Sequence, residues 1–267
     1  MTNLLALLVL GFVLGIRHAT DPDHVIAVTT IVARSKTPVA ATAIGAAWGV
    51  GHTLTILIVG GGIILFGWVI PPRLGLSMEF SVGLMLIALG IASLTVEARR
   101  IMLTQSMGDG GHRHEHPHAH GDYVHSHVHT HDPEAHPHRV EQTPLGWMDR
   151  RLGGIGAYRH LRPLIVGVVH GLAGSAAIAL LVLSTIRKPG WALAYLVVFS
   201  VGTIVGMMLM TAVIVLPFIR ANRRSVALTS GLRIASGVIS VAFGLFVAYR
   251  IGIVDGLFST LAHWTPQ

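Results

Sequence analysis

The sequence is dominated by long runs of apolar residues that are separated by shorter polar stretches. A helix needs about 20 apolar residues to cross the roughly 30 Å hydrocarbon core of a bilayer. Six segments meet this requirement, namely residues 4–33, 38–70, 79–96, 163–186, 191–218 and 232–254. A long hydrophilic stretch, residues 99–162, separates the third segment from the fourth. The pattern predicts an all-α integral membrane protein with six transmembrane helices.

The two halves of the chain share short motifs in the same order. The matching motifs are Gly15-Ile-Arg-His18 with Gly167-Val-Val-His170, Gly49-Val-Gly-His52 with Ser200-Val-Gly-Thr203, Gly83 with Gly237, and Gly90 with Gly244. An odd number of spans in each copy places the second copy in the opposite orientation, as in many secondary transporters. We therefore predict an inverted repeat of three helices, formed by residues 1–98 and 163–267, with residues 99–162 as the connecting loop.

Composition and charge favour a membrane protein over a soluble one. Only 12% of the residues are charged and 52% are hydrophobic, whereas soluble domains carry about 25% charged residues. The net charge of +7 could suggest a nucleic-acid partner, but the positive-inside rule explains it better, because most Lys and Arg fall in loops on one side. We predict a multi-pass protein of the cytoplasmic (inner) membrane, surrounded by lipid, with both termini outside, residues 99–162 in the cytoplasm, and no nucleic-acid partner.

The first predicted span is interrupted by the polar sequence Arg17-His-Ala-Thr-Asp-Pro-Asp-His24. Charged residues at this depth are costly unless paired, and they usually mark a functional site. Helical spacing places His18, Asp21 and His24 on one side, and the intervening proline favours a break that would bring Asp23 round to them. Imidazole and carboxylate ligands suit Ni²⁺, Co²⁺, Zn²⁺ or Cu²⁺. These four residues are predicted to bind a metal ion. The alternative is a structural cluster that is paired internally at a helix end.

Two further histidines lie within predicted spans. His52 is flanked by glycines that would let another helix approach closely, and His170, in a glycine-containing segment, matches His18 in the repeat. Interrupted helices at corresponding positions of two halves are a pointer to a transport site. We predict that His52 and His170 bind the metal or line its path, although each could instead be an ordinary packed histidine. Ser175 and Thr203 are weaker candidates.

A histidine-rich tract lies between His112 and His138 and holds 11 of the 17 histidines, mostly in a His-x-His pattern. Such a composition cannot build a packed core, so we expect this loop to be disordered without ligand. It is predicted to capture or buffer divalent metal, and the alternative is an inert linker. The chain has no Cys and neither a phosphate-binding loop motif nor a His-Glu-x-x-His motif. We therefore predict no enzyme activity and no resident cofactor.

Two motifs resemble those of the nickel/cobalt transporter family. His18-Ala-Thr-Asp-Pro-Asp23-His24 fits the family's His-x4-Asp-His motif, and Gly51-His52-Thr53 is similar to its Gly-His-Ser/Thr. The resemblance implies import of Ni²⁺ or Co²⁺, with His18, Asp23 and His24 central to recognition. The second half lacks the Asp-containing motifs of long members and resembles the short, six-helix branch of permeases associated with urease maturation. The histidine-rich loop also resembles that of related exporters.

We therefore expect a secondary transporter that takes up Ni²⁺, with Co²⁺ as a second substrate. The alternatives are efflux of the same ions, a membrane protein that stores or senses metal, and the membrane component of an ATP-driven transporter. The expected partners are the metal ion, membrane lipid, and a cytoplasmic metallochaperone or the urease or hydrogenase maturation proteins.

Overall fold

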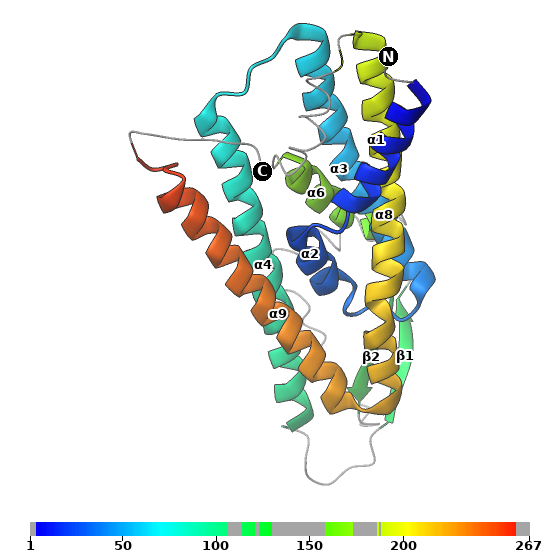
Figure 1. The fold of residues 1–267 in the computed structure, drawn as a ribbon. Coiled ribbons are helices and arrows are strands. Elements are labelled where there is room, and N and C mark those ends of the chain that lie inside the picture. The colour runs from blue at the N-terminus through cyan, green and yellow to red at the C-terminus, as the bar shows by residue number, and fades with distance from the viewer. Residues whose placement is uncertain are drawn as a thin grey trace. The chain divides into compact units, whose positions relative to one another are not determined.

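The computed structural model describes residues 4–105, 114–120, 123–129, 158–172, 186 and 188–259. The chain divides into two compact units, residues 1–99 with 163–267, called the helical unit here, and residues 100–162. The helices are α1 (Leu4–His18), α2 (Pro22–Val32), α3 (Pro38–Phe66), α4 (Pro72–Gln105), α6 (Tyr158–Leu172), α8 (Pro189–Arg224) and α9 (Val226–Tyr249), and a π-helical turn (Arg250–Val254) follows α9 (Figure 1).

Local sequence explains where the helices begin and end. Proline stands at the first position of α2, α3, α4 and α8, where its missing N–H costs nothing and its fixed φ favours the helix. The Thr37 side chain caps α3 by accepting a hydrogen bond from the Ala40 N–H. Gly67 ends α3 in the left-handed conformation at φ 64°, which glycine adopts without steric penalty.

Four helical stretches are long and apolar enough to cross a membrane: Pro38–Phe66, Pro72–Met102, Pro189–Arg224 and Val226–Val254. α1 and α2 meet at 56° and provide a fifth span if the bent pair counts as one. α6 supplies a shorter apolar segment, Pro163–Leu172. The chain is therefore a multi-pass membrane protein. The fourth predicted span is described only as far as Leu172, because residues 173–185 lie outside the described part of the chain.

α8 is the central helix of the helical unit, because both α1 and α3 pack along it (Figure 1). Gly11 lies against Tyr195 and Gly15 against Phe199, so α1 and α8 run in the same direction. α3 runs in the opposite direction and begins near the end of α8. We call the side where α1 and α8 begin the α1 side, and the side where α8 ends and α9 begins the α9 side.

α4 and α9 pack against each other through glycines. A Cβ at Gly83 would meet the Gly244 carbonyl, and one at Gly90 would meet the Gly237 carbonyl. The Ser240 hydroxyl donates to the Leu86 carbonyl across the same contact, at 2.8 Å. Small residues that let backbones touch are the usual device by which helices associate in lipid.

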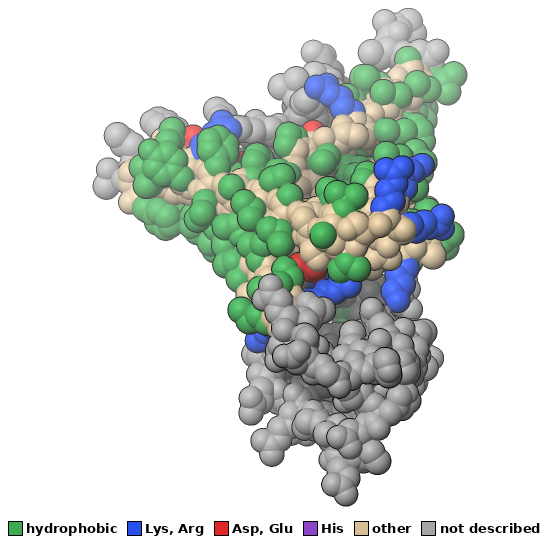
Figure 2. All heavy atoms as spheres, turned by 90° about the horizontal axis from the view of Figure 1, so that it is seen from below, with side chains coloured by type: hydrophobic (Ala, Val, Ile, Leu, Met, Phe, Trp, Pro, Cys, Tyr) green, Lys and Arg blue, Asp and Glu red, His purple; other side chains and the backbone are tan. Residues whose placement is uncertain are grey.

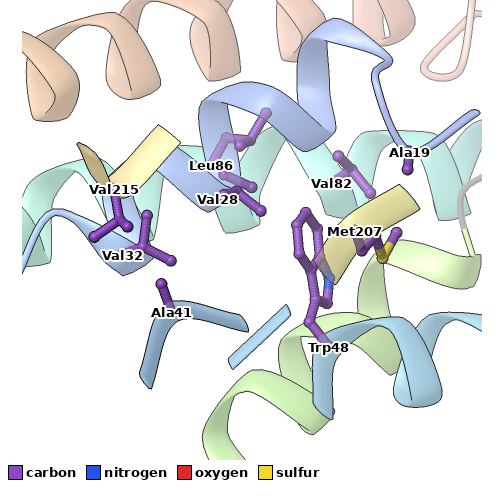
Figure 3. Close-up of a cluster of buried hydrophobic side chains, with 10 residues drawn as sticks. Ala19, Val28, Val32, Ala41, Trp48, Val82, Leu86, Met207 and Val215 are labelled. Atoms are coloured by element: carbon purple, nitrogen blue, oxygen red, sulfur yellow. The ribbon is translucent and has the colours of Figure 1, made fainter. Parts of the chain in front are cut away.

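A buried apolar cluster joins these helices around α2. Its members come from the α1–α2 break, α2, α3, α4 and α8, and they are Ala19, Ala27, Val28, Val32, Ala41, Trp48, Val82, Leu86, Met207 and Val215 (Figure 3). Met207 is fully buried here and packs among apolar side chains. The cluster fixes the position of α2, the short helix that carries the second part of the polar motif.

The surface of the helical unit is apolar over large areas. Large side chains of α8 and α9 such as Val213, Leu209 and Phe246 are more than half exposed, as expected for a surface that faces apolar lipid tails. Figure 2 views the unit from the α9 side and shows Lys and Arg side chains gathered on part of this face among the hydrophobic ones.

A buried ion-pair cluster lies near the end of α2. Glu97 of α4 is only 1% exposed and lies 3.5 Å from Arg233 of α9 and 4.0 Å from Arg34, which follows α2. The Ser230 hydroxyl donates to Glu97 at 2.6 Å, and Nε of Arg233 donates to the Ala33 carbonyl at 3.2 Å. The cluster therefore ties the chain just beyond α2 to α4 and α9.

In the second unit, strands β1 (His114–His120) and β2 (Tyr123–His129) pair antiparallel. His114 is opposite His129, His116 opposite His127, and His118 opposite His125. The sequence was expected to carry no regular structure here, so the pairing differs from that expectation. Its physical basis is the His-x-His alternation, whose period of two is that of a strand. The other residues of the predicted loop between 106 and 157 lie outside the described part.

Candidate metal site

The site is built around the break between α1 and α2. At the end of α1 the backbone tightens, with the Thr20 N–H bonded to the Arg17 carbonyl and the Asp21 N–H to the His18 carbonyl. Asp21 is extended, at φ −60° and ψ 145°, and α2 begins at the following proline. The break expected from this proline is thus present, and it turns the chain by 56°.

Three histidines meet beside this break. Nε2 of His18, at the end of α1, lies 2.9 Å from Nε2 of His52 in the middle of α3. The ring of His24, in the first turn of α2, is centred 4.8 Å from the ring of His18 and 4.9 Å from that of His52. All three side chains are buried, and each offers one ring nitrogen within 4.8 Å of the others.

A second triad shares His24 with the first. Oδ1 of Asp23 accepts a hydrogen bond from Nδ1 of His24 at 3.0 Å, and Oδ2 accepts one from Nε2 of His170 at 2.9 Å. The rings of His24 and His170 are centred 4.2 Å apart. His170 lies in the last turn of α6 and is buried. The two triads together form one continuous cluster of five ionisable side chains, called the His/Asp cluster below.

Carboxylates orient two of the imidazoles. Oδ2 of Asp21 accepts a hydrogen bond from Nδ1 of His18 at 2.8 Å, and Asp23 binds Nδ1 of His24 in the same way. A neutral imidazole that donates from Nδ1 has a free lone pair on Nε2. Such carboxylate–histidine pairs are the usual support of histidines that bind metal ions through the other nitrogen.

Asp21 differs from the other predicted ligands in its position. It contacts His18 and belongs to neither triad, and its side chain is 37% exposed. Arg17, the first residue of the polar motif, is exposed. Asp21 therefore acts on the cluster through His18.

Several ring nitrogens of the cluster are buried without a hydrogen-bond partner among the described residues. They are Nε2 of His24, Nδ1 of His52 and Nδ1 of His170. Leaving a buried polar atom unsatisfied costs about 1–3 kcal/mol, so three in one place require an explanation. Nδ1 of His24 is bonded to Asp23, so a cation that accepts the lone pair of His24 Nε2 would satisfy one of these atoms.

The helices around the cluster touch at their backbones. A Cβ at Gly15 would overlap the Phe199 carbonyl, one at Gly51 the Leu164 carbonyl, and one at Gly167 the Trp48 carbonyl. The close approach expected beside His52 is therefore present, and its partner is α6. These contacts hold α1 against α8 and α6 against α3, which brings histidines from three segments of the chain together.

Two aromatic rings that were not among the predicted site residues lie against the cluster. The Trp48 ring is centred 5.5 Å from that of His24 and 5.4 Å from that of His170. The Phe199 ring lies 5.6 Å from that of His18. Both are buried. The signal that could have found them is the repeat, because Trp48 and Phe199 stand four residues before His52 and Thr203.

Of the two weaker candidates, only Thr203 lies within the described residues. The Thr203 hydroxyl donates to the Phe199 carbonyl of its own helix at 3.0 Å, and Ser175 lies outside the described residues. The structure thus brings together His18, Asp23, His24, His52 and His170, with Asp21 behind His18.

One comparison with known proteins is informative. The chain is similar to the urease accessory protein UreH of Bacillus sp. (strain TB-90), with 37% identity over 256 residues and 96% of each chain covered. No family model matches the chain. No solved structure matches it either.

Proposed function

This chain belongs to the family of the urease accessory protein UreH, and from this premise we propose that it is a secondary transporter (permease) for Ni²⁺. Co²⁺ is its second substrate, and transport runs into the cell across the cytoplasmic membrane. The observation that carries the proposal is the buried His/Asp cluster, with its unpartnered ring nitrogens, between membrane-spanning helices. The urease accessory role of the relative supports nickel as the cargo.

The spacing of the ligand atoms suits a transition-metal ion. Two nitrogens that bind one ion at about 2.0–2.1 Å and at a right angle are about 2.9 Å apart. This is the separation of Nε2 of His18 and Nε2 of His52. His24 Nε2 completes the first triad, and imidazole-rich sites favour Ni²⁺ over hard cations such as Mg²⁺ or Ca²⁺.

The second triad gives the ion a neighbouring position. Asp23 and His170 lie next to His24, which belongs to both triads. A carboxylate in this position compensates part of the dication's charge, which is expensive to hold within a membrane. We propose that the ion passes between the two triads by exchanging ligands while His24 stays bound.

Contacts between the halves support the proposed inverted repeat. Gly15 of α1 meets the Phe199 carbonyl of α8, and Gly167 of α6 meets the Trp48 carbonyl of α3. Gly15 and Gly167 are equivalent in the sequence repeat, and so are Phe199 and Trp48. His18 and His170 also both lie in the last turn of their helices. Rocking of one half against the other would expose the cluster to each side in turn.

The basic residues support the proposed orientation. Arg34, Arg223, Arg224 and Arg233 lie on the α9 side of the helical unit, which we assign to the cytoplasm by the positive-inside rule. The histidine-rich segment, which we also assign to the cytoplasm, would capture the ion after transport, and its strand register sets histidines opposite one another. A cytoplasmic metallochaperone or the urease maturation proteins would take the ion from there.

Accumulation of radioactive nickel in cells tests cargo and direction together. Cells that express the chain should accumulate more ⁶³Ni²⁺ than cells that express His24→Ala, and His263→Ala, outside the predicted spans, should behave as wild type. Lower accumulation than in cells without the gene would mean efflux. Equal accumulation with wild type and His24→Ala would reject the His/Asp cluster as the transport site.

A further inference from the structure

The His/Asp cluster lies between two aromatic side chains that are equivalent in the sequence repeat. Trp48 and Phe199 stand four residues before His52 and Thr203. α3 and α8 run antiparallel, with Gly45 opposite Thr211, Gly49 opposite Ile204 and Gly60 opposite Leu196. This register places His52 and Thr203 at the same level. Trp48 therefore lies about 6 Å from that level toward the α9 side, and Phe199 about 6 Å toward the α1 side.

We propose that Phe199 and Trp48 are the two barriers of the ion's path, with Phe199 closing the His/Asp cluster toward the α1 side and Trp48 closing it toward the α9 side. The inference rests on the proposed function and identifies the residues that open in turn. Neither residue belongs to the proposed ligands. Both contact ligand rings directly, His18 on one side and His24 and His170 on the other.

The packing behind Phe199 is that of a closed barrier. Tyr195, one turn further toward the α1 side, stacks on Phe199 with ring centres 6.4 Å apart. Ile56 and Leu196 complete a buried cluster with Phe199. No cation could pass this layer without rearrangement, because it offers apolar surface where the ion needs ligands or water.

The packing behind Trp48 has the same character on the other side. Its indole lies beside Met207 and below Val28 and Val82 in the apolar cluster of Figure 3. Trp48 is fully buried. The structure therefore has both barriers closed, which is the occluded state that alternating access requires.

Each barrier also contains a polar atom that is left unpaired. Nε1 of Trp48 and the hydroxyl of Tyr195 are buried without a hydrogen-bond partner among the described residues. Both atoms would gain water when their own side opens. The new hydrogen bonds to water would offset part of the free energy lost when apolar contacts separate. Opening of each barrier therefore costs less than it would for a wholly apolar layer.

Because the chain contains no cysteine, a single introduced thiol reports the accessibility of one position from either side of the membrane. Thr203→Cys places one thiol at the level of the cluster, and a membrane-impermeant thiol reagent is applied to either side of vesicles that contain the full chain. Lys36→Cys and Arg73→Cys, both exposed and on opposite sides, calibrate which side is reached. Trp48→Ala should raise labelling of the Thr203→Cys thiol from the α9 side only, and Phe199→Ala from the α1 side only. The expected increase is about tenfold, as for an open population that rises from about 1% to about 10%.

Phe246→Ala removes an aromatic ring that is 56% exposed and serves as the matched control, with no expected change on either side. Trp48→Leu and Phe199→Leu repeat the test with smaller packing defects, and all variants are checked by gel filtration. Labelling that rises equally from both sides, from the wrong side, or not at all in folded variants overturns the proposal. The labelling assay needs no metal. If each variant raises labelling from its expected side only but the chain carries no nickel flux, nickel is rejected as the cargo and the two barriers stand. If the chain carries nickel flux but neither variant raises labelling from its expected side, only the assignment of Trp48 and Phe199 as barriers is rejected.

Discussion

Nε2 of His18 and Nε2 of His52 lie 2.9 Å apart, although 34 residues separate the two histidines in the chain. The contact joins the end of the broken first span to the middle of α3. Asp21 holds Nδ1 of His18 from behind, so the free lone pair of His18 points at His52. One of the two nitrogens must carry a proton for them to bond in this state, and a bound cation would replace that proton.

Asp21→Asn should weaken nickel binding without abolishing it. The carboxylate fixes the ring and tautomer of His18, and losing such support typically lowers metal affinity by about 10–100-fold. Isothermal titration of the purified chain with Ni²⁺ measures the change. Asp255→Asn removes a carboxylate that lies 3.9 Å from Arg250, far along the chain from the cluster, and should leave the affinity unchanged. A loss of affinity as large as that of His18→Ala would instead make Asp21 a direct ligand.

Nickel binding should weaken as the pH falls, because protons compete with the metal for imidazole nitrogens. The sign follows from the ligand set, since His binds metal only when the coordinating nitrogen is unprotonated. Titrations in two buffers with different ionisation enthalpies should also show proton release on binding at neutral pH. Affinity that is independent of pH from about 5 to 7.5 would contradict a site made mainly of histidine.

Gly167→Ala should destabilise the helical unit and lower transport. The added methyl group would overlap the Trp48 carbonyl and push α6 away from α3, at a cost of about 1–3 kcal/mol. Gly61→Ala is the matched control, since its Cβ would meet nothing within 4 Å and alanine favours the helix by about 0.5–1 kcal/mol. Thermal unfolding in detergent should move in opposite directions for the two variants. Equal stability of both would mean that the α3–α6 contact is looser than described.

Glu97→Ala should destabilise the chain more than Glu97→Gln. The carboxylate is buried beside Arg233 and Arg34, and removing one partner of a buried ion pair costs about 3–5 kcal/mol. Glutamine keeps the shape and can still accept the hydrogen bond of Ser230. Thermal unfolding of both variants measures the order. A destabilisation by alanine of less than about 1 kcal/mol would mean that water screens the cluster.

Most of the spans could be predicted from apolar run length alone, because a bilayer demands about 20 apolar residues whatever the neighbours are. The helix ends could not. The third span was predicted over 79–96, yet α4 runs from Pro72 to Gln105, because helices continue past the hydrocarbon core wherever no residue stops them. The sixth was predicted over 232–254, whereas α9 begins at Val226 beside the Ser225 cap.

The residues that meet in the His/Asp cluster could be picked out from the sequence, because polar residues inside apolar spans are rare and costly. The atomic contacts within the cluster could not be predicted, because they depend on the 56° break between α1 and α2 and on backbone contacts at glycines far apart in the chain. Asp21 illustrates the limit. Helical spacing placed it with His18 and His24, but the chain leaves the helix at His18, so its carboxylate lies behind His18. Trp48 and Phe199 do not stand out in this way, because single aromatic residues in apolar helices usually pack in the core.

The central claim is that the His/Asp cluster carries the ion, and nickel flux into proteoliposomes tests it most directly. The purified full chain, reconstituted without ATP or other proteins, should give saturable ⁶³Ni²⁺ uptake, and His52→Ala should remove it while the folded protein remains in the membrane. Flux through His52→Ala equal to that of the wild-type chain would contradict the account.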